Sequence, residues 1–286
     1  ENKQIDNIEP YEKLLSQKLV EECMIAANRC GARFLAQHQA SGPFVVHRGF
    51  RKERLDEVRK FLEMHVPALA QEDPQSVAGY RAIMRGLSDP ANPLPLRPMV
   101  NRLMTRAELG CEPAPHMGMA LECYTNCTSP LRKYVDFLAH LQIKSALHGD
   151  SASQVSEDTL KLLGERLSIS RLATQEAERW LANKYLARIS NTDGDQVTFQ
   201  GRIAHVNSSG FNVRLDDNGL EGFVDLRKDP EKFSYDKWTA SLTSTTRRFQ
   251  LQQSVEITYQ GVDGENACQS LFKLVQGCGL KPPKVE

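Results

Sequence analysis

The sequence predicts an α+β protein in which a mainly helical part is followed by a small five-stranded antiparallel β-barrel. Up to about residue 190, apolar residues recur at every third or fourth position, which is the period of an amphipathic helix. After Ser190 the period falls to two, which is typical of strands with one buried face. The sequence DDNG at residues 216–219 is a strong hairpin turn signal. We therefore expect two domains, over residues 1–190 and 191–286.

Five helices are expected in the first domain. Apolar residues that we expect to be buried follow the first helix from Leu15 and Leu19 to Phe34, and the last helix from Leu160 to Trp180. Residues 44–46 and 116–121 are apolar enough for short strands, and residues 88–98 hold four prolines, which predicts a loop. The expected helices span about 9–38, 52–64, 74–87, 130–149 and 156–189.

Strands of the second domain are expected from the alternation of apolar and polar residues. Three of them fall between residues 197 and 226, and a long irregular connection separates them from two more, at about 254–259 and 268–274. Five short antiparallel strands with an excursion after the third match the OB-type barrel, a common nucleic-acid-binding fold.

Composition restricts the function in three ways. Lys plus Arg and Asp plus Glu number 36 each, so the net charge is zero, and a nucleic-acid partner would need a local basic surface. No apolar run approaches the roughly 18 residues of a membrane span. Seven cysteines without a C-x-x-C motif indicate reduced cytoplasmic thiols rather than a zinc site. The chain also starts at Glu1 instead of methionine, which suggests part of a longer protein.

The barrel sequence carries a specific resemblance. GRIAHVNSSGFNVRLDDNGLEGFVDL, at residues 201–226, resembles the OB-fold RNA-binding domain repeated in the largest small-subunit ribosomal protein. The resemblance implies that Phe211 and Phe223 are platforms on which bases stack, and that Arg202 and Arg214 contact phosphates. The alternative is that both phenylalanines fill the barrel core.

The helical part resembles a nuclease family. PHMGMALECYTNCTSPLRKYVDFLAH at residues 115–140 is similar to the signature of the ribonuclease II family of processive 3′→5′ exoribonucleases, and nearest to its bacterial branch. VEECMIAANRCGARFL at 20–35 and FVVHRGF at 44–50 resemble the preceding helix and strand of the same catalytic RNB domain. The resemblance extends from about residue 14 to 274, in the family's order.

This resemblance implies hydrolysis of single-stranded RNA, one nucleotide at a time, to nucleoside 5′-monophosphates. The family holds Mg²⁺ with a cluster of aspartates that activates water and stabilises the leaving oxygen. Residues 1–110 contain no such cluster. We therefore expect the metal ligands to lie upstream of this chain, and we expect the chain alone to be inactive.

Arg132, in the sequence TSPLRKY, matches the family arginine that holds the scissile phosphate. The preceding Ser129 and Pro130 predict a helix start, and the free N–H groups and dipole of a helix N-terminus favour an anion. A guanidinium at that point can also donate two parallel hydrogen bonds to a phosphate. The alternative is an ordinary ion pair between Arg132 and Asp136 on one helix face.

Several other positions depend on the family pattern. Glu21 and Glu22 match acidic positions near the bound RNA end, and the alternative, nearly as well supported, is a solvated helix face. His116 and His140 are expected to be hydrogen-bonded structural histidines, and Tyr134 is expected in the core. Among the departures from the pattern, Asn126 and Cys127 replace bulky residues, and Leu141 replaces an arginine.

The most consequential departure is on the long helix before the barrel. When the chain is aligned on Trp180-Leu181, Thr174 stands where the family has a catalytic glutamate. Glu178, one turn further along the helix, is the nearest substitute. Thr174 therefore leaves an alternative open, namely a catalytically inactive RNA-binding or regulatory protein. A protein-binding barrel on a helical scaffold is a third interpretation, which the neutral charge permits.

Overall fold

A computed structural model describes residues 5–9, 11–149, 154–192, 195–263, 269–275 and 279–280. The chain divides into two compact units. Residues 13–170 form one, called here the helical unit, and residues 1–12 with 171–286 form the other, called the barrel unit. The 33-residue helix α6 (Glu157–Ile189) contributes residues to both.

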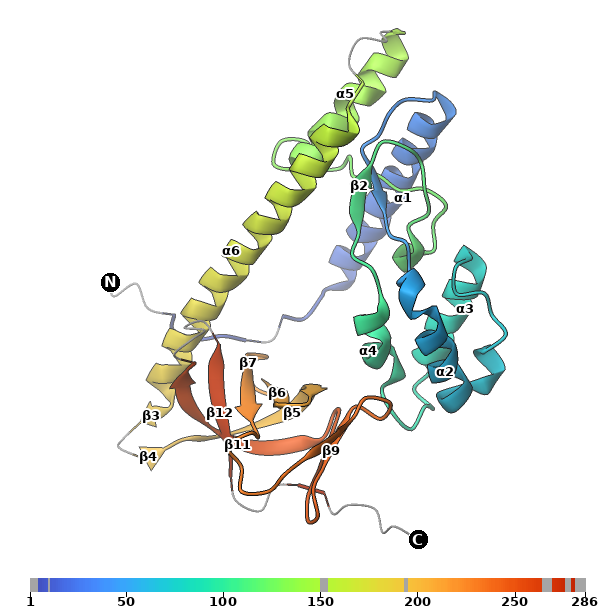
Figure 1. The fold of residues 1–286 in the computed structure, drawn as a ribbon. Coiled ribbons are helices and arrows are strands. Elements are labelled where there is room, and N and C mark those ends of the chain that lie inside the picture. The colour runs from blue at the N-terminus through green and yellow to red at the C-terminus, as the bar shows by residue number, and fades with distance from the viewer. Residues whose placement is uncertain are drawn as a thin grey trace. The chain divides into compact units, whose positions relative to one another are not determined.

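Helices and one small sheet build the helical unit (Figure 1). Strands β1 and β2 pair antiparallel, with Phe44 opposite Gly110 and Val46 opposite Glu108. Short 3-10 turns lie at Lys52–Arg54, Pro67–Leu69, Asn101–Leu103 and Met117–Met119. The other elements of this unit are α1 (Leu15–Gln37), β1 (Phe44–Val46), α2 (Leu55–His65), α3 (Val77–Leu87), α4 (Leu96–Val100), β2 (Glu108–Gly110), α5 (Tyr134–His148) and the first part of α6.

The buried face of α1 differs from the predicted one. Asn28, Ala32 and Leu35 are buried, and Ala32 and Leu35 pack with Phe44 in the core. By contrast, Leu15 is 83% exposed, and the prediction that its apolar row lies inward is wrong. Burial on α6 is likewise confined to its two ends, because Leu160 and Leu186 are fully buried whereas Leu167, Leu172 and Trp180 are exposed.

Two local predictions around the signature sequence are also wrong. Residues 116–121 fold back on themselves around the 3-10 turn Met117–Met119 instead of forming a strand, because Ala120 adopts a left-handed conformation and the His116 N–H bonds to the Leu121 carbonyl oxygen. Helix α5 begins at Tyr134 rather than at residue 130. Tyr134 is 56% exposed and therefore lies outside the core.

The barrel unit contains a closed five-stranded barrel in the order β5-β6-β7-β12-β11, with β11 returning to β5 (Figure 1). Its strands are β5 (Thr198–Asn207), β6 (Gly210–Leu215), β7 (Glu221–Asp225), β11 (Ser254–Val262) and β12 (Ser270–Leu274). The prediction of a fully antiparallel barrel is wrong, because β7 and β12 run parallel. A closed ring with an odd number of strands cannot alternate direction throughout, so one neighbouring pair must be parallel.

The connection between β7 and β11, predicted to be irregular, contains a three-stranded sheet of β8 (Ser234–Asp236), β9 (Ser241–Thr243) and β10 (Arg248–Gln250). Phe249 of β10 is fully buried, and its ring centroid lies 4.9 Å from that of Phe211 in the barrel. The added sheet therefore shares the core of the barrel. Two short strands, β3 (Asn191–Thr192) and β4 (Asp195–Gln196), precede the barrel. Cys268, in the predicted last strand, lies outside the described residues.

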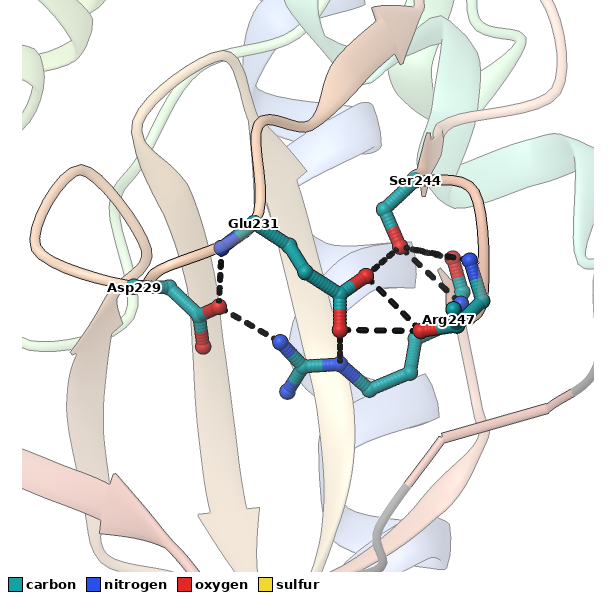
Figure 2. Close-up of polar contacts among 5 residues, drawn as sticks. Asp229, Glu231, Ser244 and Arg247 are labelled. Atoms are coloured by element: carbon teal, nitrogen blue, oxygen red, sulfur yellow. Dashed lines mark hydrogen bonds and ion pairs between the residues drawn. The ribbon is translucent and has the colours of Figure 1, made fainter.

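Arg247 holds this connection together through a polar cluster (Figure 2). Its Nε donates to Glu231 Oε1 at 2.9 Å, and its Nη2 donates to Asp229 Oδ1 at 2.5 Å. The hydroxyls of Ser244 and Thr246 also donate to the Glu231 carboxylate. These hydroxyl bonds, together with Arg247, lower the pKa of Glu231 below its ordinary value of 4.5.

The Arg247 cluster predicts a pH-dependent stability. A carboxyl whose pKa is lower in the folded state stabilises the fold above its unfolded pKa, and this contribution is lost as the pH falls through the folded pKa. The melting temperature should therefore fall as the pH drops below 4.5. Arg247→Met should lower the melting temperature at neutral pH and flatten its acid dependence. Lys232→Met, at an exposed cation of the same connection, should do neither; identical pH profiles for both variants would refute the role of Arg247.

Candidate functional site

A pocket of about 540 Å³ lies in the helical unit, beside the start of α5. Helix α1 contributes Glu21, Ile25 and Asn28, and the segment before α5 contributes Tyr124 and Lys133. These residues come from two of the three sequence segments that resemble the nuclease family, at 20–35 and 115–140. The remaining lining residues are Ser16, Gln17, Val20, Met24, Met119, Asn126 and Thr128.

Arg132 directly precedes Lys133, which is the N-cap residue of α5. Its side chain is exposed, and among the described residues no hydrogen bond or ion pair engages the guanidinium. Asp136, the alternative partner, is fully buried and accepts a hydrogen bond of 2.8 Å from the Ser129 N–H. The Arg132–Asp136 ion pair is therefore not formed, and all five donors of Arg132 are available to a ligand.

A buried polar network fixes the segment that leads to Arg132. Asn28 Nδ2 donates to the Tyr124 hydroxyl at 2.8 Å, and the Cys127 N–H donates to Asn28 Oδ1 at 2.8 Å. The ring of His140 bonds to the Cys127 carbonyl oxygen at 2.7 Å, as expected of a structural histidine. Sequence reasoning missed Asn28, although an amide within an apolar helix face was the signal that could have found it.

His116 and His47 stack on one another, with ring centroids 5.5 Å apart. Burial lowers the pKa of each histidine, and the neighbouring His47 lowers that of His116 further. His47 Nδ1 accepts the Gly118 N–H at 3.1 Å, so that nitrogen carries no proton. His116 is not hydrogen-bonded through Nδ1, which is buried without a partner in the described part of the chain.

The two acidic residues predicted on α1 differ in position. Glu21 lines the 540 Å³ pocket and forms an ion pair with Lys13, whereas Glu22 is exposed and does not line it. The pocket therefore combines one carboxylate with the cation of Lys133. Arg132 does not line the pocket but is the residue directly before Lys133 in the sequence. Such a mixed, open site can orient a phosphate-containing chain while leaving room for a sugar or base.

On the barrel, the two predicted arginines lie side by side on the outer surface. Arg202 is opposite Arg214 in the strand register, and Arg214 is opposite Glu221. Arg214 Nε donates to Glu221 at 2.8 Å, and Arg202 lies 3.6 Å from Asp216. Both pairs are largely exposed, so an incoming phosphate can compete for these cations at small cost.

The two predicted stacking residues differ in burial. Phe211 is fully buried and packs on Phe249, so its ring faces are closed to a base, and the prediction of a stacking role for it is wrong. Phe223 alternates with the buried residues Gly222 and Val224 on β7 and is partly exposed. Only Phe223 can therefore offer a ring surface to a ligand.

Replacing the two phenylalanines should separate core from surface. Phe211→Ala removes a fully buried ring and should lower the free energy of unfolding by about 3–5 kcal/mol. Phe223→Ala should change stability much less and should weaken RNA binding, since stacking on one ring contributes about 1–3 kcal/mol per base. Urea unfolding and titration of the chain with labelled single-stranded RNA give the two quantities. A stacking role for Phe223 does not survive if its variant binds RNA as the wild type does.

Glu178 lies in the barrel unit, whereas Arg132 lies in the helical unit. It lines a pocket of about 410 Å³ together with Arg179 of α6 and with Asn212 and Glu221 of the barrel surface. Polar and apolar residues of the barrel surface, Leu220 among them, complete the lining of this pocket. Thr174, on the same helix, also has an interaction partner.

No group of three or more His, Cys, Asp or Glu side chains in the described part of the chain is arranged to hold a metal ion. Nor does any helix described there have the length and hydropathy needed to cross a bilayer.

Comparison with known proteins places these features in a family context. The family model for the RNB domain matches residues 1–149. Exoribonuclease 2 of Salmonella arizonae and that of Escherichia fergusonii are each 33% identical to the chain over 211 residues, which cover 73% of this chain and 32% of the relative. The chain thus spans about a third of the length of these relatives.

Solved structures show the same fold. Mycoplasma genitalium RNase R in complex with ribose methylated single-stranded RNA aligns with a TM-score of 0.68 at 19% identity, covering 93% of this chain and 42% of that one. The structure of yeast Ssd1, a pseudonuclease, aligns with a TM-score of 0.60 at 19% identity, covering 82% and 30%.

Proposed function

The chain belongs to the RNB-domain family, and from that premise we propose that it is part of a 3′→5′ exoribonuclease. The protein would degrade single-stranded RNA processively to nucleoside 5′-monophosphates. Residues 1–190 would supply part of the catalytic domain, and residues 191–286 an RNA-binding barrel. The relatives named exoribonuclease 2 support the reaction class, and the cytoplasm is the expected location.

The observation that carries the proposal is the unengaged guanidinium of Arg132. It lies at the N-terminal end of α5, where free N–H groups and the helix dipole already favour an anion. A carboxylate that could have paired with it, Asp136, is instead bonded to the backbone. Arg132 can therefore hold a phosphate and stabilise the charge that builds on it during hydrolysis.

Magnesium is the expected cofactor of such a hydrolase, in which it would activate water. The residues described here do not fit a metal site, since no suitable cluster of ligands is present among them. We propose that the ligands belong to a preceding part of the protein. Within this chain, Glu21 and Glu22 would lie near the RNA end, with only Glu21 lining the pocket.

The barrel is proposed to be of the OB type and to bind the same RNA strand. Five strands, closed with one parallel pair and interrupted after the third by an added sheet, support this assignment. In OB folds the second and third strands form the binding face. Here these strands are β6 and β7, which carry Arg214 and Phe223, with Arg202 adjacent on β5.

A catalytically inactive RNA-binding protein is the second candidate. Thr174 favours it, because a hydroxyl at the position of the family glutamate cannot replace a carboxylate in proton transfer. Yeast Ssd1, which is described as a pseudonuclease, has a similar fold. If a carboxylate is still required, we propose that Glu178 supplies it.

An exonuclease assay decides between these two functions. The 286-residue chain and a form that includes preceding sequence are each incubated with 5′-labelled single-stranded RNA and Mg²⁺. We expect a ladder of shortened products, sensitive to EDTA, from the extended form alone. RNA binding without a ladder in the extended form supports the inactive alternative, and Glu178→Gln should abolish the ladder if Glu178 takes part.

A further inference from the structure

Three arginines converge on a second pocket of the helical unit, about 260 Å³ in volume. Arg29 and Arg33 come from successive turns of α1, and Arg81 comes from α3. All three side chains are exposed. The other lining residues are Val77, Ala78, Ala120, Leu121, Glu122 and Cys123.

The charge of this arginine pocket is not balanced by the protein. Among the described residues, no hydrogen bond or ion pair engages Arg29, Arg33 or Arg81. Glu122 is the one carboxylate lining the pocket, so three positive charges minus one negative charge leave an excess of two. Like charges held together repel one another, and an anion would relieve that repulsion.

Several other arginines of the same unit are paired with carboxylates. Arg54 and Arg102 both bind Glu57, and Arg48 binds Glu108 at 2.6 Å. Because the chain as a whole has zero net charge, acidic partners are as numerous as basic residues. The excess positive charge of this pocket therefore comes from three arginines lining it together, and not from a shortage of carboxylates in the chain.

The backbone of α3 adds donors to the same pocket. Its N-cap residue Ser76 accepts the Gly79 N–H at 3.0 Å, whereas the N–H groups of Val77 and Ala78 have no partner in the described part of the chain. These two residues line the pocket. Guanidinium groups and free helix N–H groups both donate hydrogen bonds to anionic oxygens. A phosphate group, which carries several such oxygens, therefore suits this pocket.

The arginine pocket also continues the site beside α5. Along α1, Glu21 and Ile25 line the 540 Å³ pocket, and the next positions at the same spacing of four, Arg29 and Arg33, line the arginine pocket. Residues 119–124 contribute to both pockets. A chain molecule lying along this face of α1 would therefore meet both.

We propose that the arginine pocket binds a phosphate group of the RNA strand, at a point separate from the phosphate held by Arg132. The assignment to RNA rests on the proposed function, whereas the assignment to phosphate rests on the pocket alone. A free phosphate ion has the same chemistry and is the other possible source of the ligand.

The test uses the 286-residue chain and two triple variants. R29Q/R33Q/R81Q removes the pocket cations. K18Q/R59Q/R85Q removes three exposed cations from α1, α2 and α3 that do not line the pocket, and it serves as the matched control. Circular dichroism melts establish that both variants fold. Affinity for a labelled single-stranded oligoribonucleotide is then measured by fluorescence anisotropy over a series of salt concentrations.

Each neutralised phosphate of a single strand contributes about 0.7 to the slope of log affinity against log salt, so loss of the one phosphate held by this pocket should lower that slope by about 0.7. We expect this reduction for the pocket variant and not for the control. A second arm measures the melting temperature with inorganic phosphate against chloride at equal ionic strength. Phosphate should stabilise the wild type and the control, but not the pocket variant.

The two arms separate the possible failures. Equal slopes for both variants, with phosphate stabilisation lost only in the pocket variant, would contradict RNA as the source and assign the pocket to free phosphate. Equal behaviour in both arms would contradict the site itself. If the wild type binds no RNA, the proposed function fails, and the phosphate arm still decides whether the arginine pocket binds an anion.

Discussion

Replacing Arg132 by alanine is expected to lower the turnover of single-stranded RNA by about 10²- to 10³-fold, the range seen when one preorganised donor to a developing charge is lost. RNA affinity should change much less, because many other contacts hold the strand. The measurement is single-turnover kinetics and equilibrium binding, made in a form of the protein that hydrolyses RNA. The expectation depends on the free guanidinium at the start of α5.

Two further variants sharpen the Arg132 experiment. Arg132→Lys should recover only part of the activity, since a point charge cannot make the two-pronged contact of a guanidinium. Arg59→Ala, at an exposed arginine of α2, should leave turnover unchanged. Equal losses in binding and turnover for Arg132→Ala would indicate a tethering contact, and no loss would remove Arg132 from the site.

Replacing Asp136 by alanine is expected to reduce both stability and turnover. The carboxylate is fully buried and accepts the Ser129 N–H, which holds the turn that carries Arg132. Loss of the acceptor leaves a backbone donor unsatisfied, at a cost of about 1–3 kcal/mol in the free energy of unfolding. Arg132 would then be less well positioned, so turnover should fall while the pH dependence of the reaction stays unchanged.

The matched control for Asp136 is Asp56→Ala, because Asp56 also lies in the first turn of a helix but is exposed. It should cost little stability and no turnover. Asp136→Asn retains an oxygen that can accept the Ser129 N–H and should recover much of the activity. If Asp136→Ala unfolds no more easily than Asp56→Ala, the positioning role is excluded.

Helices were predicted better than their buried faces. The period of apolar residues located α1 and α6, but it could not show that Leu15 and Leu172 are exposed, because periodicity reports which residues share a face and not what covers that face. The buried face of α1 instead includes Asn28, whose amide bonds to Tyr124 and Cys127. Such a partner from another segment cannot be read from local sequence.

In the barrel, the alternation of side chains along each strand already distinguishes Phe211 from Phe223. Phe211 lies on the same face of its strand as Val213 and Leu215, which are core residues. Phe223 lies on the opposite face of its strand from the buried Val224. The parallel pair followed from closing an odd number of strands. The added sheet β8–β10 was missed because its strands are only three residues long, too short for a periodic pattern.

The arginine pocket was beyond sequence reasoning for a different reason. Arg29 and Arg33 are one turn apart on α1, but Arg81 joins them only through the fold. A neutral overall composition conceals such a local excess of charge. The same holds for Arg132, since its ion-pair alternative could be set aside only after the Asp136 carboxylate was placed against Ser129.

The most direct test of the account is to locate the 3′ end of bound RNA on the chain. A single-stranded oligoribonucleotide with 4-thiouridine at its 3′ end is bound to the 286-residue chain, irradiated, and the crosslinked peptides are identified by mass spectrometry. We predict crosslinks to α1 around Glu21 and to the segment around Arg132 and Lys133, lost on Arg132→Ala. Crosslinks confined to the barrel, or unchanged in the variant, would contradict the assignment of this site to the RNA end.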